Sequence, residues 1–394
     1  MQIGIIGKPS SGKSTFFKAA TLAEVEIHTR PFTTLKSTEG EAYVKIDCIC
    51  KEFNVTCNPT SGFCIKSKRF VPFKLIDVPG LIKDAHLGRG CGNKFLDDLR
   101  QADAFIHVVD ISGSTDEEGN FVKPLTYHPE KDIEFLDHEL DMWYFQILKK
   151  GWEKFARTVQ QENQDIKKAL AKQLSGLKVT EDDVQESIKE LKLTHLPLEW
   201  SDDDLKSLAS SLRKKTKPMI IAANKIDVEG ALYNLDKVKE KFNYPIIPCS
   251  AESELALREA HKHKLIEYLP GTSSFKIIGN LNEEQKKALE FIKKFLEKNK
   301  TTGVQEILNT IVFDLLKYIT VYPGGVNKLE DQHGNILPDC FLMESGSTAL
   351  DFAYKLHSDI GDNFIKAIDV KTKKVIGKDH ILKNRDVIEI MVKK

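Results

Sequence analysis

The sequence predicts an α/β fold in which a parallel sheet carries polar loops at its strand ends, interrupted by a helical insertion and followed by a smaller domain. Three observations predict it. A short apolar run at residues 2–6 leads through a glycine-containing loop into a helix. Further strand-like runs, at residues 73–77, 105–110 and 219–223, end at or next to an Asp or Asn. From residue 318 onward, short strands surround one helical stretch.

The loop at residues 7–14 fills every required position of the phosphate-binding pattern G-x-x-x-x-G-K-[ST], between a strand and a helix. Backbone N–H groups of such a loop surround a phosphate, and the helix N-terminus adds partial positive charge. We expect Lys13 to reach the β- and γ-phosphates of a nucleotide and Ser14 to bind Mg²⁺. The residues expected around the phosphates are Gly7, Pro9, Ser10, Ser11, Gly12, Lys13, Ser14 and Thr15.

Composition and charge restrict the class of protein. The 394 residues suffice for two or three domains, with 41% apolar and 29% charged residues, as in soluble globular proteins. Lys plus Arg and Asp plus Glu both number 58, so global charge does not indicate a polyanionic partner. No apolar run approaches the ~20 residues that span a bilayer. The odd number of cysteines does not indicate a secreted disulfide framework, and we expect a cytoplasmic monomer.

Two further segments supply what a phosphate and Mg²⁺ site requires. The strand at residues 73–77 ends in Asp77, the expected partner of Mg²⁺, and Gly80 can turn its N–H onto the γ-phosphate. Such a contact makes a loop sensitive to the presence of that phosphate. The polar loop after the first helix contains Thr33 and Thr34, either of which could reach the γ-phosphate through Mg²⁺.

Motifs for a purine base follow at the ends of the next two predicted strands: Asn224, Lys225 and Asp227 after the first, and Ser250, Ala251 and Glu252 after the second. The Asp227 carboxylate can accept from guanine N1–H and the 2-amino group, a pair that adenine does not present. Acceptors left unmatched discriminate strongly, so guanine nucleotide is the expected ligand. We expect Asn224 to tie this loop to the phosphate loop, the Lys225 stem to lie over the base, and the Ala251 N–H to donate to O6.

Between the third and fourth motifs the apolar periodicity becomes helical, with Ile133, Leu136, Leu140, Trp143 and Ile147 at three-four spacing. Thr180 with Asp183 and Ser201 with Asp204 are helix capping signals. The apolar stripe predicts a seam between helices. We expect a first part of the nucleotide domain, a helical insertion, a second part, connecting helices and a C-terminal β-grasp domain, at residues 1–131, 132–217, 218–280, 281–317 and 318–394.

The motifs resemble those of the Obg-type family of translation-associated GTPases, and within it the archaeal YchF-like branch. The resemblance rests on residues 31–34, which are similar to switch I, on the glycine-rich residues 77–92, and on residues 302–306, 337–339 and 377–388. It implies a Ras-like P-loop GTPase sheet with an α-helical insertion and a C-terminal TGS domain. It also implies Thr34 as the Mg²⁺ ligand and a ribosome or RNA partner. Bacterial and eukaryotic YchF proteins with an altered fourth motif prefer ATP, whereas Asn224 to Asp227 is intact here. Ser10 stands where many potassium-dependent relatives have Asn, which leaves potassium activation open.

Hydrolysis is expected to be slow. Leu81 follows Gly80 where Ras-type enzymes hold a water-orienting Gln, and an aliphatic side chain cannot orient water. Beside Lys13, Thr34 and Gly80, we consider two further groups: Arg89 for transition-state charge and His86 for positioning water. The alternative is that Arg89 and His86 are surface residues of the switch loop.

Four thiols lie within seventeen residues, at Cys48, Cys50, Cys57 and Cys64. Their number suffices for a tetrahedral Zn²⁺ site. The spacing lacks the usual C-x2-C pair, so free thiols on a hairpin are the alternative.

Three classes of function fit these motifs. The first is a nucleotide-dependent switch in translation, and the second is a regulatory RNA-binding protein whose nucleotide site is mainly structural. The third, a phosphate-loop metabolic kinase, is disfavoured because no second substrate pocket or acid–base group is recognisable. Basic residues between 371 and 385 could contact nucleic-acid phosphates, or form a solvated face.

Overall fold

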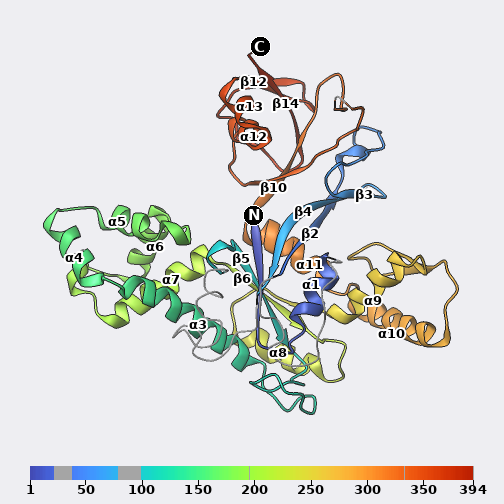
Figure 1. The fold of residues 1–394 in the computed structure, drawn as a ribbon, viewed down its shortest axis with the longest axis horizontal. Helices are drawn as coiled ribbons and strands as arrows, with labels where there is room; N and C mark the ends of the chain where they lie inside the picture. Colours follow the sequence, from blue (N-terminus) through green and yellow to red (C-terminus); the bar gives the residue numbers. More distant parts are fainter. Residues whose placement is uncertain (22–37, 79–98, 195, 332, 394) are drawn as a thin grey trace. The chain divides into compact units, whose positions relative to one another are not determined.

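The computed structural model describes the chain apart from residues 22–37, 79–98, 195, 332 and 394 (Figure 1). Its contacts divide it into two compact units, Met1–Gly40 with Lys74–Ile307, and Glu41–Phe73 with Leu308–Lys394. The predicted boundaries place residues 41–73 in the nucleotide domain, whereas this division groups them with the C-terminal segment. The domain boundaries themselves stay a prediction.

The first unit holds the parallel core, β4-β1-β5-β6-β7, of a seven-stranded sheet whose path begins with β2, and β3 pairs antiparallel with β4 beside that path. Both neighbours of β1 pair with it in parallel, and β5 pairs in the same way with β6. Every residue of β5 and β6 is buried, as expected for strands covered on both faces. The strands are β1 (Gln2–Ile6), β2 (Thr38–Asp47), β4 (Lys68–Asp77), β5 (Ala104–Asp110), β6 (Met219–Asn224) and β7 (Ile246–Pro248). The α/β class is confirmed.

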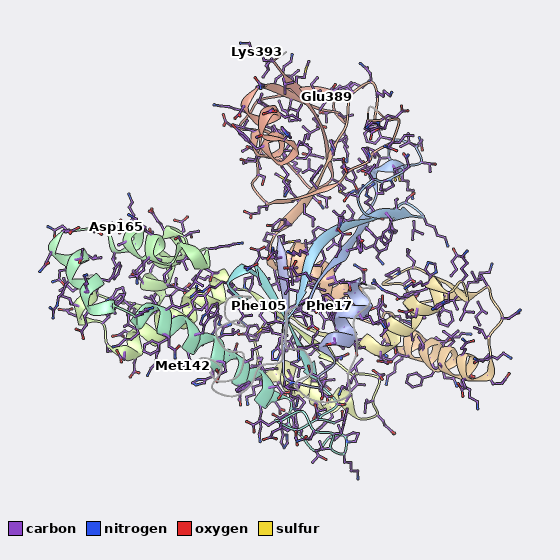
Figure 2. All side chains as sticks on the ribbon, viewed as in Figure 1. Phe17, Phe105, Met142, Asp165, Glu389 and Lys393 are labelled. Carbon is purple, nitrogen blue, oxygen red and sulfur yellow. The ribbon has the colours of Figure 1, made fainter. Side chains whose placement is uncertain are left out.

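Helices and one hairpin complete the nucleotide part of this unit. Phe17 of α1 and Phe105 of β5, both labelled in Figure 2, are fully buried. Within the described residues, no helix is both long enough and apolar enough to cross a bilayer. The elements are α1 (Lys13–Thr21), α8 (Ala231–Lys241), α9 (Ala251–Lys262), the β8 (Ile266–Tyr268) and β9 (Phe275–Ile277) hairpin, α10 (Glu283–Asn299) and α11 (Val304–Asn309).

The helical insertion forms where the periodicity predicts it. Both capping predictions are confirmed, because Thr180 and Ser201 each complete a reciprocal capping box. Leu136, Leu140 and Trp143 are buried in one core with apolar residues of α7, so their stripe is a helix seam. The helices are α3 (Glu130–Lys149), α4 (Trp152–Gln161), α5 (Ile166–Gln173), α6 (Glu181–Leu191) and α7 (Asp202–Thr216).

One buried cation joins the first and last helices of the insertion. The Arg213 side chain is 1% exposed and donates from Nε to Asp141 at 2.8 Å and from Nη2 to Asp137 at 3.1 Å. The Tyr244 hydroxyl donates to the same Asp137 carboxylate at 2.7 Å. These contacts join the two helices of the insertion to Tyr244, which lies between α8 and β7.

The second unit contains a mixed five-stranded sheet with the order β11-β10-β14-β12-β13. Its central strands β10 and β14 are parallel, and the remaining pairs are antiparallel. Phe352 of the helix α12 is buried in its core, as expected for a β-grasp domain. The elements are η1 (Ile49–Lys51), β3 (Phe63–Ile65), β10 (Tyr318–Pro323), β11 (Phe341–Glu344), α12 (Ala349–Leu356), α13 (Ser358–Asp362), β12 (Phe364–Asp369), β13 (Lys374–Ile376) and β14 (Asp386–Val392).

We expect Arg213→Ala to lower the free energy of unfolding of the insertion by about 3 kcal/mol, because it leaves two carboxylates together without their cation. The three tryptophans, Trp143, Trp152 and Trp200, all lie in the insertion, so their fluorescence in urea reports its unfolding. The exposed neighbour Lys214 supplies the control, since Lys214→Ala should change stability by less than about 0.5 kcal/mol. Equal effects of the two substitutions would contradict the assigned role of Arg213.

Candidate functional site

The phosphate loop is closed by one side chain from a distant strand. The Asn224 amide Nδ2 donates to the Ser11 carbonyl at 3.0 Å, as the sequence predicts. Gly12 has φ +96°, and a Cβ there would lie 2.2 Å from Asn224 Nδ2. Only glycine therefore permits this approach. Position 7 is also restricted to glycine, because a Cβ added at Gly7 would lie 2.5 Å from the Val108 carbonyl oxygen.

Lys13 and Ser14 lie at the start of α1, where the helix dipole favours anions. Burial lowers the pKa of Lys13 to about 8, although Asp77 opposes that shift. Its ammonium donates to the carbonyl of Lys8 at 2.7 Å, inside the loop. A phosphate bound at this position would stabilise the charged form of the Lys13 amine.

Ser14 and Asp77 come together as predicted, with Ser14 Oγ donating to Asp77 Oδ2 at 3.0 Å. Asp77 Oδ1 is buried and has no hydrogen-bond partner among the described residues. Burial also raises the pKa of Asp77. A hydroxyl and a carboxylate with an unpartnered oxygen are the hard donors that Mg²⁺ prefers, so these residues fit the ion. Within the same described part, the buried Ser11 Oγ is likewise unpartnered.

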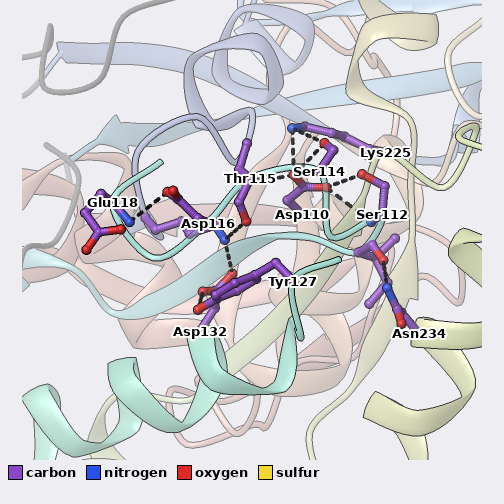
Figure 3. A network of polar contacts seen from close by, with 12 residues as sticks. Asp110, Ser112, Ser114, Thr115, Asp116, Glu118, Tyr127, Asp132, Lys225 and Asn234 are labelled. Atoms are coloured by element: carbon purple, nitrogen blue, oxygen red, sulfur yellow. Dashed lines mark hydrogen bonds and ion pairs between the residues drawn. The ribbon is translucent and has the colours of Figure 1, made fainter. Parts of the chain in front are cut away.

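Lys8 is a site residue that the pattern does not reveal, because it occupies a variable position. Its ammonium donates to the Thr115 carbonyl at 2.8 Å, lies 3.0 Å from Asp132 Oδ2 and stands 3.8 Å from the centre of the Tyr127 ring. Figure 3 shows these three partners. Burial lowers the pKa of Lys8 and raises that of Asp132 to about 6. The loop after β5 is thereby attached to the outside of the phosphate loop.

The base motif has an anchor that sequence reasoning missed. Asp110 is the register neighbour of Asn224 on the adjacent strand, and Lys225 Nζ lies 2.8 Å from its Oδ2. Burial opposes ionisation of Asp110, yet the Lys225 ammonium and nearby hydroxyls lower its pKa (Figure 3). Ser112, Ser114 and Thr115 donate their hydroxyls to this carboxylate. The Lys225 stem is therefore held in place at the base loop.

The Ala251 N–H has a partner in this structure, because it donates to Asn224 Oδ1 at 3.0 Å. Asn224 thus joins the phosphate loop and the start of α9 through its two amide atoms. Ser250 caps α9 by accepting from the Ser253 N–H, and Glu252 lies in its first turn. The expected contact of the Ala251 N–H with guanine O6 stays a prediction.

Several predicted residues lie outside the described part of the chain. They are Thr33, Thr34, Gly80, Leu81, His86 and Arg89. Among the described ones, Pro9, Ser10 and Thr15 belong to the phosphate loop and its helix, with Ser10 at φ +59°. Asp227 follows Lys225 in the turn after β6 and is partly exposed. The contacts of Asn224 and Asp77 thus bring four of the predicted motifs into one site: the phosphate loop, Asp77, residues 224–227 and residues 250–252.

The four predicted thiols also come together, in the second unit. The Sγ atoms of Cys48, Cys50, Cys57 and Cys64 all lie within 4.8 Å of one another. All four are free cysteines, and the first two are buried.

Comparison with known families agrees with this site. Residues 222–325 match the family described as Obg-like GTPase YGR210-like, G4 motif-containing domain, residues 2–140 match 50S ribosome-binding GTPase, and residues 328–392 match the TGS domain. The GTP-binding protein MJ1332 of Methanocaldococcus jannaschii is 50% identical over 99% of this chain and 98% of its own. A ribosome-binding ATPase YchF of Buchnera aphidicola is 29% identical over 93% of this chain and 88% of its own.

A solved structure shows the same architecture over the whole chain. The GTP-binding protein of Pyrococcus horikoshii OT3 has 40% sequence identity and a TM-score of 0.78, and the match covers 100% of both chains. The closed phosphate loop, the intact base motif and these relatives lead to one assignment: the chain belongs to the YchF/Obg-like family of P-loop GTPases that carry a C-terminal TGS domain.

Proposed function

We propose that this protein binds GTP with Mg²⁺, hydrolyses it slowly to GDP and phosphate, and acts as a nucleotide-dependent switch on the ribosome, as a monomer in the cytoplasm. The observation that supports the proposal most is the double contact of Asn224. Its amide joins the phosphate loop to the first residue of α9, at 3.0 Å on each side. Phosphate and base recognition are thereby parts of one rigid site.

Guanine preference follows from the acceptors of Asp227. The Lys225 stem, held by Asp110 at 2.8 Å, would cover one face of the base, and the Asp227 carboxylate would accept from N1–H and the 2-amino group. Adenine leaves those acceptors unmatched, which costs binding free energy. The Lys225–Asp110 pair limits the positions that the neighbouring Asp227 can adopt.

Phosphate binding is proposed for Lys13 and the backbone of residues 7–14. Ser14 and Asp77, with Thr34, would hold Mg²⁺, which supplies charge neutralisation at the β- and γ-phosphates when bound. Lys13 would place its ammonium on the same oxygens, and its burial strengthens that contact. Gly80 and Thr34 would meet the γ-phosphate, and their release after hydrolysis would be the switch.

Slow turnover is proposed because Leu81 offers no group that orients water. Arg89 and His86 remain the candidates for assistance within the chain. A partner that supplies a water-orienting group would accelerate hydrolysis. The protein would then return to its GDP state only when that partner is bound.

Ribosome binding is supported by the matched family, 50S ribosome-binding GTPase, and by the similarity to the ribosome-binding ATPase YchF. In the second unit, Lys371 and Arg385 pair with Glu52, while Lys373, Lys374 and Lys378 are exposed. These three lysines are the proposed phosphate contacts, and Lys383 of the same basic group is exposed as well. The alternative is a regulatory RNA-binding protein whose nucleotide site is mainly structural.

We expect the wild type to prefer GTP over ATP by at least about 100-fold and Asp227→Asn to transfer that preference to xanthosine nucleotides, because the amide matches xanthine. Affinities are measured by competition with a fluorescent GDP analogue. Asp236→Asn, on the exposed face of α8, is the matched control and should bind like the wild type. Equal wild-type affinity for ATP and GTP would refute guanine recognition.

Nucleotide binding should take up protons at alkaline pH. In the protein alone, the Lys13 pKa of about 8 leaves half of its amine uncharged at pH 8, and a bound phosphate restores the charge. Calorimetry with GDP in buffers of different ionisation enthalpy should give an uptake of about half a proton at pH 8 and near zero at pH 6.5. Lys13→Arg should remove the uptake, since guanidinium stays charged. A wild-type uptake that does not change between these pH values contradicts the assignment.

The proposed function is tested by co-sedimentation with ribosomes in GDP and in a non-hydrolysable GTP analogue. We expect more protein on ribosomes with the analogue. Replacing Lys373, Lys374 and Lys378 by Glu should weaken binding and reduce the slope of log affinity against log salt by about 3. A matched triple change on α10, at the exposed Lys287, Lys293 and Lys298, should have little effect. If ribosome binding is equal with GDP and with the GTP analogue, and ribosomes do not stimulate hydrolysis, the alternative of an RNA-binding protein with a mainly structural nucleotide site is favoured.

A further inference from the structure

The cysteine cluster of the second unit has the dimensions of a metal site. The Sγ atoms of Cys48 and Cys57 stand 3.8 Å apart, and all four sulfurs lie within 4.8 Å of one another. Four sulfurs at about 2.3 Å from one Zn²⁺ ion are about 3.8 Å from each other in a tetrahedron. A small closing movement of the free thiols would therefore give this geometry.

Four separate backbone positions converge to make the cluster. Cys48 directly follows β2 and donates its N–H to the Ser67 carbonyl at 2.9 Å, beside the hairpin turn. The short η1 helix then brings Cys50 to the same side, which accounts for a C-x-C pair in place of C-x2-C. Cys64 lies on β3 opposite Arg69, close to the two-residue turn at Lys66 and Ser67, whose φ values are +50° and +59°. The thiols therefore come from the end of β2, the η1 helix, the loop after it and β3, and not from one local turn.

The segment that carries the thiols has little core of its own. Ile49 and the first two thiols are buried, but none of the residues from 51 to 68, all of them described, is buried. Polar bonds attach this segment to residues 336–338, with the Asn58 N–H donating to Ile336 at 3.1 Å and the Thr60 N–H to Pro338 at 3.0 Å. The buried Arg69 guanidinium donates to the Leu337 and Pro338 carbonyls. Segments without an apolar core commonly depend on a disulfide or a metal.

Nearby charge also suits an anionic metal centre. Four thiolates and one Zn²⁺ ion carry a net charge of about −2. The hollow beside Cys48 is lined by more cationic than acidic side chains: Lys51, Lys66, Lys68 and Arg385 against Asp47 and Glu52. A positive surplus at this place lowers the cost of four neighbouring thiolates.

We propose that Cys48, Cys50, Cys57 and Cys64 bind one Zn²⁺ ion in a closed structural site that holds the β2–β3 segment in the second unit. On binding, each of the four thiols transfers its proton to solvent and forms one Zn–S bond, with no change of oxidation state. Four protein ligands leave no open position, so the site is structural and not catalytic. The proposal is independent of the nucleotide site, which lies in the other unit.

Metal content of the full chain tests it. Protein produced in zinc-supplemented medium and purified without chelators should contain about one zinc per chain, measured by inductively coupled plasma mass spectrometry. Cys57→Ser and Cys64→Ser should each lose most of that zinc, whereas Cys340→Ser, a buried cysteine of the same unit, should retain it. Replacement of zinc by Co²⁺ should give the visible absorption of tetrahedral thiolate coordination.

A second measurement separates metal loss from general misfolding. Chelator treatment of the wild type should accelerate trypsin cleavage at the exposed Lys51 and Lys66, and zinc should restore protection. GDP affinity, measured in the same samples, should stay within about twofold, because it reports the other unit. The proposal is overturned if the chain takes up neither zinc nor cobalt, if Cys57→Ser keeps full zinc, if iron occupies the site, or if the four thiols are isolated as disulfides.

Discussion

The close approach of Asn224 to the phosphate loop is the constraint on which the nucleotide site depends. Its amide needs Gly12, because a Cβ there would lie 2.2 Å from Nδ2, and it satisfies Ser11 and Ala251 at once. The contact exists because β1 and β6, with β5 between them, run in parallel and end at the same edge. A buried amide with both ends bonded also fixes one arrangement of three loops, since any slip would leave a polar group unpaired.

Around that contact the chain buries several ionisable groups that cost stability. Lys8 is paired with Asp132 and Lys225 with Asp110, so these charges are compensated within the protein. Burial shifts the pKa values of Lys13 and Asp77 in the same directions as those of Lys8 and Asp132, but the Lys13 ammonium donates to a neutral carbonyl, and Asp77 Oδ1 is unpartnered within the described residues. Uncompensated groups of this kind concentrate where a ligand supplies the missing partner, which separates binding residues from supporting ones.

The sequence predicts well those features that depend on local spacing. The strand–loop–helix at the N-terminus, the Ser14–Asp77 contact, both capping boxes and the seam of α3 and α7 all follow from short patterns. The contacts of Lys8, Asp110 and Ala251 do not, because each depends on which strands become neighbours. Asp110 can hold Lys225 only since register places it beside Asn224. Short strands such as β11 and β13 carry too few residues for a clear alternation, and the grouping of residues 41–73 with the C-terminal segment depends on contacts remote in sequence.

The helical insertion shows why this fold tolerates a long interruption between two adjacent strands. β5 and β6 pair directly over six positions, from Phe105 with Met219 to Asp110 with Asn224, although the insertion separates them in sequence. Its first and last helices are antiparallel neighbours joined by Arg213, so the chain returns close to the end of β5. The packing of these two helices largely offsets the entropy cost of closing so long a loop. Lys217 completes the return by donating its buried ammonium to the Ala102 and Arg100 carbonyls. The insertion therefore leaves the direct pairing of β5 with β6 intact, and with it the position of Asp110 opposite Asn224.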